Sequence, residues 1–144
     1  MRLTVFTDYA LRVLMYLAVD PERRVRIRDV AEGYGISRNH LMKVVNKLTR
    51  AELVEASRGV NGGLILARPA EEITVGEVVR KCEDDIALVE CFRNDNQCVI
   101  TPECELKKVF GHARDEFMTV LDQYTIADLV KPGARLRRRL KIPA

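Results

Sequence analysis

The sequence has no hydrophobic run long enough to cross a membrane. Charged residues interrupt the longest apolar stretches within a few positions, whereas a membrane-spanning helix needs about 20 consecutive apolar residues. The N-terminal stretch carries Asp8 and Arg12 inside its apolar part and has no small-residue cleavage site, so it does not resemble a secretion signal. We therefore expect a cytoplasmic protein with no membrane as a partner.

Arrangements that support catalysis are also missing. The sequence contains no paired acid and base residues, no phosphate-binding loop and no nucleophile placed beside a histidine. It contains no internal repeat and no low-complexity segment. We therefore do not expect an enzyme.

The charges are distributed unevenly along the 144 residues. Residues 1–70 carry 12 Lys/Arg and 7 Asp/Glu (net +5), residues 71–134 carry 7 and 14 (net −7), and residues 135–144 carry 5 and 0 (net +5). A basic N-terminal part beside an acidic middle indicates a polyanion-binding region joined to something else. The alternative is an uneven solvated surface without a function.

Three helices are predicted in the first fifty residues. The first covers residues 4–19, with Thr7 as its N-cap and Asp8 in its first turn, where a carboxylate suits the helix dipole. A second, over residues 25–34, is followed by a turn that contains Gly35. Ser37 then caps a third helix over 38–51, and the last two helices have a helix-turn-helix pattern.

A β-hairpin is predicted next. Two short β-like runs, 53–57 and 64–67, are connected by RGVNGG at 58–63, which is rich in residues that accept positive φ. Three helices followed by a basic hairpin form a winged helix-turn-helix, in which the third helix enters the major groove. A winged helix that binds protein instead of DNA is the main alternative.

The predicted DNA contacts lie at the start of the third helix and at the tip of the hairpin. Asn and Arg can bind adenine or guanine edges with two hydrogen bonds, and Lys and Ser can contact phosphates or bases. An arginine between glycines can approach a minor groove closely. The candidates are Ser37, Arg38, Asn39, His40, Lys43 and Lys47 of the helix and Arg58, Asn61, Gly62 and Gly63 of the hairpin.

The remainder of the chain is predicted to be helical around one cysteine-containing loop. A helix starts in ITVGEVVRKC, where Thr74 and Glu77 have capping-box spacing, and Thr125 caps a short helix that ends at Pro132. Between them, a long helix over about 103–124 has an apolar side that suits either a dimer interface or a packed helix. The basic tail suits either sequence-independent DNA contact or a disordered, solubilising end.

The expected fold class is therefore mainly α with a small β-hairpin wing: a winged helix-turn-helix domain plus a long dimerisation helix. We divide the chain into a DNA-binding domain (1–70), a connecting helix with the cysteine loop (71–102), a dimerisation helix with the terminal helix (103–131) and a basic tail (132–144).

Three cysteines lie in the loop ECFRNDNQCVITPEC: Cys91, Cys98 and Cys104. Their C-x6-C-x5-C spacing is wider than the pairs typical of structural zinc sites, while iron–sulfur clusters tolerate varied spacing. An iron–sulfur cluster, zinc with a fourth ligand, and a thiol switch all remain open. Cys82 is expected to be a small buried residue, and His112 a surface residue.

Several motifs of this sequence resemble those of a known family of iron–sulfur winged-helix repressors. They are LTVFTDYALR at 3–12, GISRNHLMKVVNKL at 35–48, RGVNGG at 58–63, the three cysteines and YTIADLV at 124–130. FTDY, SRNH and YT-ADLV are similar to the nitric-oxide-sensing branch. The cluster-biogenesis branch has a histidine ligand three residues after its third cysteine, a position that is Lys107 here.

The resemblance implies a homodimer that binds double-stranded operator DNA and responds to nitric oxide. It implies an iron–sulfur cluster held by Cys91, Cys98 and Cys104, with Asp8 of the other subunit as the fourth ligand. Three cysteines and one carboxylate suit [4Fe-4S] well and do not exclude [2Fe-2S]. Two alternatives are a regulator that responds to iron or redox state and a cluster carrier that does not bind DNA.

Overall fold

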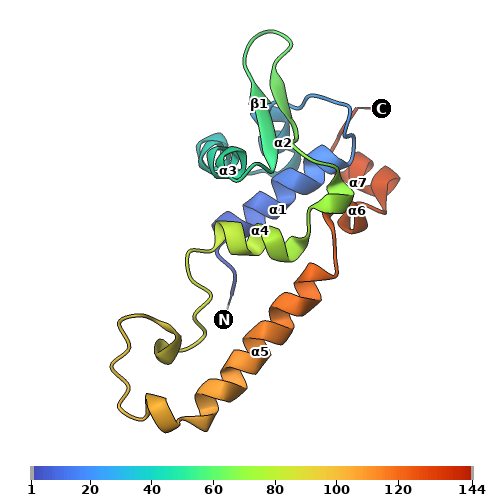
Figure 1. The fold of residues 1–144 in the computed structure, drawn as a ribbon. Coiled ribbons are helices and arrows are strands. Elements are labelled where there is room, and N and C mark those ends of the chain that lie inside the picture. Colours follow the sequence, from blue (N-terminus) through green and yellow to red (C-terminus); the bar gives the residue numbers. More distant parts are fainter. Residues whose placement is uncertain (1, 144) are drawn as a thin grey trace.

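The computed structural model describes residues 2–143 and is mainly helical, with one two-stranded antiparallel sheet (Figure 1). The first part of the chain forms α1 (Val5–Ala18), α2 (Ile27–Tyr34), α3 (Arg38–Arg50), β1 (Val54–Ser57) and β2 (Gly63–Leu66). The fold is that of a winged helix-turn-helix, as the sequence predicts. We call α1–α3 and the hairpin the head.

The N-cap of helix α1 lies one turn earlier than predicted. Thr4, whose backbone is extended, is the N-cap, and its hydroxyl accepts a hydrogen bond from the Thr7 amide at 3.3 Å. The prediction that Thr7 is the N-cap is therefore wrong. Thr7 is fully buried, with its hydroxyl 3.1 Å from that of Thr4. Asp8 does lie in the first turn of α1.

The turn between α2 and α3 has the conformation that its sequence predicts. Gly35 ends α2 in the left-handed region, at φ 65°, which a glycine adopts without strain. Ser37 caps α3 by accepting a hydrogen bond from the His40 amide at 3.5 Å. The inner face of α3 is buried against α1 and consists of Leu41, Val44, Val45 and Leu48.

The hairpin is joined to the head through β2. Val54 pairs with Leu66 and Ser57 with Gly63, and Leu64 forms two backbone hydrogen bonds with Val25, at 2.7 and 3.0 Å. Gly62 is required at the turn because a Cβ there would lie 2.4 Å from the Ser57 carbonyl oxygen. These contacts hold the hairpin in one orientation relative to α3.

The second part of the chain forms a long arm that leaves the head and returns to it (Figure 1). A short 3₁₀ helix, η1 (Ala70–Glu72), precedes α4 (Val75–Cys82). The cysteine loop follows and contains two further 3₁₀ helices, η2 (Glu90–Phe92) and η3 (Thr101–Glu103).

Two helices then lead the chain back to the head. Helix α5 (Glu105–Asp122) begins two residues later than predicted because Cys104 has an extended backbone. Thr125 caps α6 (Ile126–Leu129) in a capping box with Asp128, as expected.

The basic C-terminal residues form an ordered helix, α7 (Gly133–Arg139), so the alternative of a disordered end is wrong. Leu140 and Ile142 are buried in the core of the head, and apolar burial holds this end in place. Arg137 adds an ion pair with Asp20 at 3.2 Å and donates to the Val19 carbonyl oxygen at 3.4 Å.

Helix α5 leaves apolar side chains exposed along its length. Leu106, Val109 and Val120 are each at least half exposed, as is Tyr124 just beyond the end of the helix, and Phe110 and Phe117 are partly buried. The apolar side predicted for this helix is thus covered only in part within residues 2–143, where Phe117 and Leu121 pack against a small buried cluster. Among these residues, no helix is long and apolar enough to span a membrane.

Removing the side chain of Leu140 should destabilise the head, although it lies close to the end of the chain. For Leu140→Ala we expect the free energy of unfolding to fall by about 2–5 kcal/mol, because a buried leucine leaves a cavity. Arg139→Ala removes an exposed neighbour and should change it by less than about 0.5 kcal/mol. Urea denaturation followed by circular dichroism measures both, and equal midpoints would contradict the packing of α7.

Candidate nucleic-acid interface and metal centre

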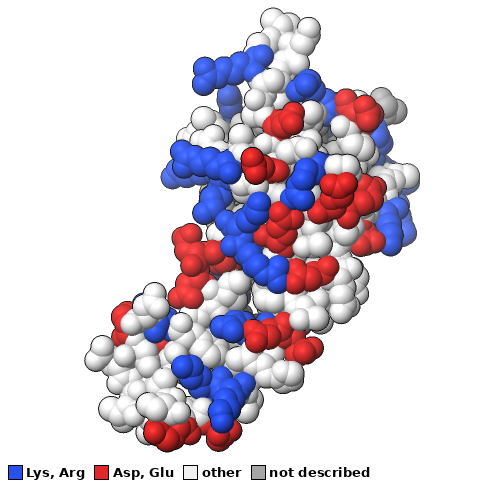
Figure 2. All heavy atoms as spheres, viewed as in Figure 1, with Lys and Arg blue, Asp and Glu red and all other residues white. Residues whose placement is uncertain are grey.

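The outer face of α3 presents polar side chains to solvent. Ser37, Arg38, Asn39 and Lys43 are exposed, because they lie on the side of α3 opposite to its buried apolar residues. Figure 2 shows Lys and Arg side chains gathered on this side of the head. The exposed groups include donors and acceptors that can contact base edges.

Two of the predicted DNA contacts are partly engaged within the protein. The His40 ring packs edge-on against Tyr9 of α1, with ring centroids 4.9 Å apart. Lys47 is half-buried, with its amine 3.8 Å from the Asp84 carboxylate. His40 therefore connects α3 to α1, and Lys47 connects it to the segment that follows α4.

The tip of the hairpin exposes Arg58 and Asn61, while Gly62 and Gly63 are half-buried in the turn. Two arginines from the segment before α2, which were not among the predicted contacts, support this tip. Arg24 donates to the Ser57 hydroxyl at 3.0 Å, and Arg26 donates to the Val60 carbonyl oxygen at 3.1 Å. The basic run RRVRIR at 23–28 is the signal that could have indicated them.

A groove of about 430 Å³ lies between α2, α3 and the hairpin. Its lining includes Arg28 and Asn46, which the sequence analysis did not single out, together with Arg26 and Arg38. Three cations around one groove beside the predicted recognition helix suit a phosphate backbone.

Asp8 lies in the head, whereas the cysteine loop lies at the far end of α5 (Figure 1). Its carboxylate is about half exposed and is paired with Arg12 one turn later, at 2.7 Å to Nη2 and 3.2 Å to Nε. The Arg12 guanidinium is 5.7 Å from the ring centroids of Tyr9 and Tyr34. Asp8 is therefore accessible from outside the chain and has one charged partner within it.

All three loop cysteines are free thiols. Cys91 and Cys104 are half-buried and Cys98 is exposed. Within residues 2–143, no three His, Cys, Asp or Glu side chains converge closely enough to hold a metal ion. The donor types nonetheless fit an iron–sulfur cluster, because one loop supplies three thiols and leaves one ligand to come from elsewhere.

Hydrogen bonds of polar side chains give this loop its shape. Asn96 accepts from the Cys98 amide at 3.0 Å and donates to the Thr101 hydroxyl at 2.8 Å. Glu90 accepts from the Gln97 amide at 2.8 Å. The loop backbone is thus held by local hydrogen bonds, and its three thiols range from half-buried to exposed.

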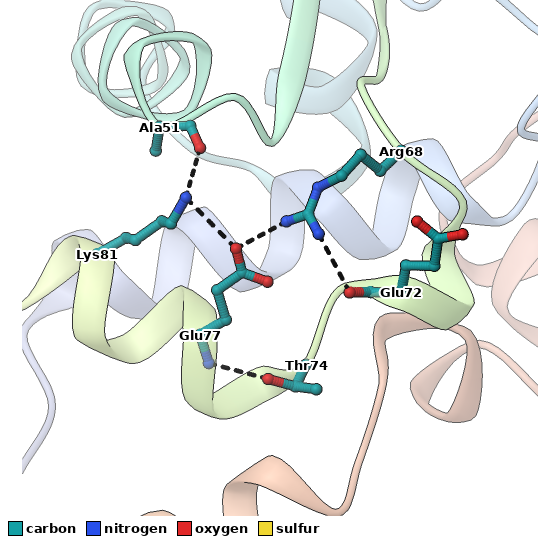
Figure 3. A network of polar contacts seen from close by, with 6 residues as sticks. All are labelled: Ala51, Arg68, Glu72, Thr74, Glu77 and Lys81. Carbon is teal, nitrogen blue, oxygen red and sulfur yellow. Dashed lines mark hydrogen bonds and ion pairs between the residues drawn. The ribbon is translucent and has the colours of Figure 1, made fainter.

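Helix α4, which leads into the loop, is bound to the end of α3 by a polar network (Figure 3). Lys81 donates to the Ala51 carbonyl oxygen at 2.7 Å and lies 3.3 Å from Glu77, which also pairs with Arg68 at 2.7 Å. Burial opposes the ionisation of Glu77, but hydrogen bonds from Arg68 and Lys81 outweigh it and lower its pKa. The network contains fully charged groups at neutral pH.

Cys82 is buried at the end of α4, as expected. Burial raises the pKa of its thiol to about 11, which leaves it protonated at neutral pH. It therefore differs in reactivity from the loop cysteines.

Alkylation of the reduced, cluster-free protein should separate these cysteines. Near neutral pH we expect iodoacetamide to modify Cys91, Cys98 and Cys104 well before Cys82, because the thiolate is the reactive form. Peptide mass spectrometry measures the order, and the urea-unfolded protein, in which all four should react alike, is the control. Equal rates in the folded protein would contradict the burial of Cys82.

Comparisons with known proteins agree with this architecture. The model of the Rrf2 family, described as an iron-dependent transcriptional regulator, matches residues 3–132. The chain is 49% identical over 144 residues to the HTH-type transcriptional regulator NsrR of Bacillus subtilis (strain 168), covering 99% of both chains. It is 46% identical to the NsrR of Geobacillus kaustophilus, covering 98% of this chain and 97% of that one.

Solved structures show the same fold. IscR of T. potens has a TM-score of 0.73 at 28% identity, covering 92% of this chain and 88% of that one. CymR, the global cysteine regulator of B. subtilis, has a TM-score of 0.74 at 25% identity, with 92% and 98% covered. The motif resemblance is confirmed, as is the expectation that the protein is not an enzyme. The chain belongs to the Rrf2 family of winged-helix transcriptional regulators.

Proposed function

We propose that this regulator is a homodimeric repressor that holds an iron–sulfur cluster and releases operator DNA in response to nitric oxide. The observation that carries the proposal is an incomplete ligand set: three free thiols on one loop, and a half-exposed carboxylate, Asp8, elsewhere in the chain. The near full-length similarity to regulators named NsrR supports the same function.

In this proposal, Cys91, Cys98 and Cys104 hold the cluster and Asp8 of the partner subunit completes its ligands. When bound, the cluster would supply iron that reacts with nitric oxide. A carboxylate is a harder ligand than the thiolates and is expected to be the most readily displaced of the four. Three cysteines and one carboxylate suit [4Fe-4S] and do not exclude [2Fe-2S].

The apolar side of α5 is the proposed dimer interface. The exposed residues Leu106, Val109 and Val120, with Tyr124 just after the helix, form a stripe that a second copy of the helix would cover. Because α5 carries the cysteine loop at its start, dimerisation through this helix would bring each loop toward the other subunit.

Asp8 would then have two alternative partners. While it serves the other subunit, Arg12 has no carboxylate from its own helix; once released, Asp8 returns to the ion pair with Arg12. Helix α1, which bears both residues, packs directly on α3. A shift of α1 would therefore change the spacing of the two recognition helices on a palindromic operator and reduce affinity.

Substitutions on the outer face of α3 test the DNA-binding part of the proposal. Arg38→Ala and Asn39→Ala should each weaken operator binding by about 1–3 kcal/mol, the cost of losing a base contact made by two hydrogen bonds. Lys108→Ala, which removes an exposed cation from α5, should leave affinity unchanged. Fluorescence anisotropy with labelled operator DNA measures all three, and wild-type affinity of both α3 variants would exclude this face.

Nitric oxide titration tests the sensing part. Anaerobic, cluster-loaded protein on operator DNA should dissociate as nitric oxide is added, and absorption spectra report the state of the cluster. Unchanged affinity after the cluster has reacted would disprove the mechanism. Oxygen and an iron chelator should release DNA less effectively; equal or stronger release by the chelator would favour an iron-responsive regulator, the function that the family description suggests.

Asp8→Ala tests the fourth ligand by itself. We expect an altered cluster spectrum and faster loss of the cluster to a chelator, because one ligand position is left to solvent. Glu22→Ala, which removes an exposed carboxylate elsewhere in the head, is the control. A wild-type spectrum and loss rate for Asp8→Ala would remove Asp8 from the site.

A further inference from the structure

Helix α1 begins with half of a capping box. In a complete box, the N-cap side chain accepts from the backbone of the third helical residue, whose Glu or Gln side chain accepts from the N-cap amide. The first of these bonds is present, because the Thr4 hydroxyl accepts from the Thr7 amide. The second is missing, because the third helical residue is Thr7, a buried threonine without a carboxylate that could accept from the Thr4 amide. The amide of Thr4 is therefore left without an acceptor from its own helix.

Glu83 supplies that acceptor from a distant part of the chain. One oxygen of its carboxylate, Oε1, accepts from the Thr4 amide at 2.8 Å and from the Thr4 hydroxyl at 2.9 Å. Glu83 is the first residue after α4 and lies eight positions before Cys91, at the root of the cysteine loop. The cap of α1 is therefore completed by the loop of the same subunit.

We propose that Glu83 is the positioning residue for Asp8, and this inference rests on the proposed role of Asp8 as a ligand in the partner subunit. Asp8 donates its amide to the Thr4 carbonyl oxygen at 3.1 Å, in the first turn of α1. Any displacement of Thr4 thus passes to Asp8 within one helical turn. By holding Thr4, Glu83 holds the carboxylate in the place from which it reaches the other subunit.

This arrangement couples the two metal centres of the dimer. In each subunit, Glu83 at the start of the cysteine loop positions Asp8, and that Asp8 is a ligand of the cluster in the other subunit. Each subunit therefore orients the ligand that it donates through the segment that carries its own cysteines. Disturbance of one loop weakens the ligand set of the other. Loss of the two clusters is therefore cooperative, and Glu83 carries the coupling.

The neighbouring residue, Asp84, provides a matched control. It bears the same charge one position later, but 98% of its side chain is exposed, and its ion pair with Lys47, at 3.8 Å, is long. An exposed pair of this kind contributes little. Asp84→Asn therefore removes one negative charge from the root of the loop without touching the cap of α1.

The first measurement uses the cluster-free protein. Hydrogen exchange at the amides of Thr4, Thr7 and Asp8 should be about fivefold faster in Glu83→Ala than in the wild type, the size of effect that loss of a helix cap produces. Glu83→Gln keeps an oxygen acceptor and should fall between the two. Asp84→Asn should exchange as the wild type does, and thermal unfolding confirms that each variant is folded.

The second measurement uses cluster-loaded protein in a double-mutant cycle. Glu83→Ala should speed cluster loss to a chelator and make its time course less cooperative. In an Asp8→Ala background the same change should have no further effect, because Glu83 acts through Asp8. If Glu83 had a purely structural role, Glu83→Ala would speed cluster loss equally in the wild-type and Asp8→Ala backgrounds.

The outcomes distinguish the positioning role of Glu83 from the ligand role of Asp8 on which it rests. If Asp8→Ala leaves the cluster spectrum and loss rate unchanged, the proposed ligand role and this inference both fail. If Asp8→Ala alters them but Glu83→Ala behaves like Asp84→Asn, the positioning role alone is overturned. An effect of Glu83→Ala that persists undiminished without Asp8 also overturns it, because Glu83 would then act on the loop directly.

Discussion

Every part of the head is assembled around α1, whose inner side is closed to solvent. Ala10, Val13 and Leu14 are fully buried, and the helix packs against α3, α4, α6 and β2. Because protein cores are dense and do not deform continuously, a helix with this many neighbours moves only if they move with it. The proposed ligand Asp8 lies on this helix. A change in the bonding of its carboxylate therefore acts on the helix against which the recognition helix α3 packs.

Polar contacts at the edges of the core set where elements sit relative to one another. Lys81 holds the end of α3 to α4, Glu83 holds the start of α1 to the root of the loop, and Arg137 holds the C-terminal helix to Asp20. Exposed or half-exposed pairs contribute little free energy individually, so burial of the apolar core supplies most of the stability. The polar contacts instead join segments that lie far apart in the sequence. Such contacts are needed if a change in the cysteine loop is to alter the position of the DNA-binding head.

Local signals predicted much of the fold. Gly35, Ser37 and Thr125 mark helix ends within one turn of where the structure has them, because capping and left-handed turns depend on few neighbouring residues. The N-cap of α1 was assigned to the wrong residue because the side chains of Thr4 and Thr7 are both able to cap a helix. In the structure Thr4 has the extended backbone of an N-cap and Thr7 is buried within the helix, and that burial depends on the rest of the chain.

The sequence by itself determined the chemistry available: three thiols in one loop, a carboxylate in the first turn of a helix, and hydrogen-bonding side chains at the start of another. The tertiary structure decided which of these groups meet. Glu83 and Thr4 are 79 residues apart, and Arg24 and Arg26 reach the hairpin from before α2. The physical reason is range: a cap or a turn is set within a few residues, whereas a contact between distant segments depends on the path of the whole chain and the burial that holds it.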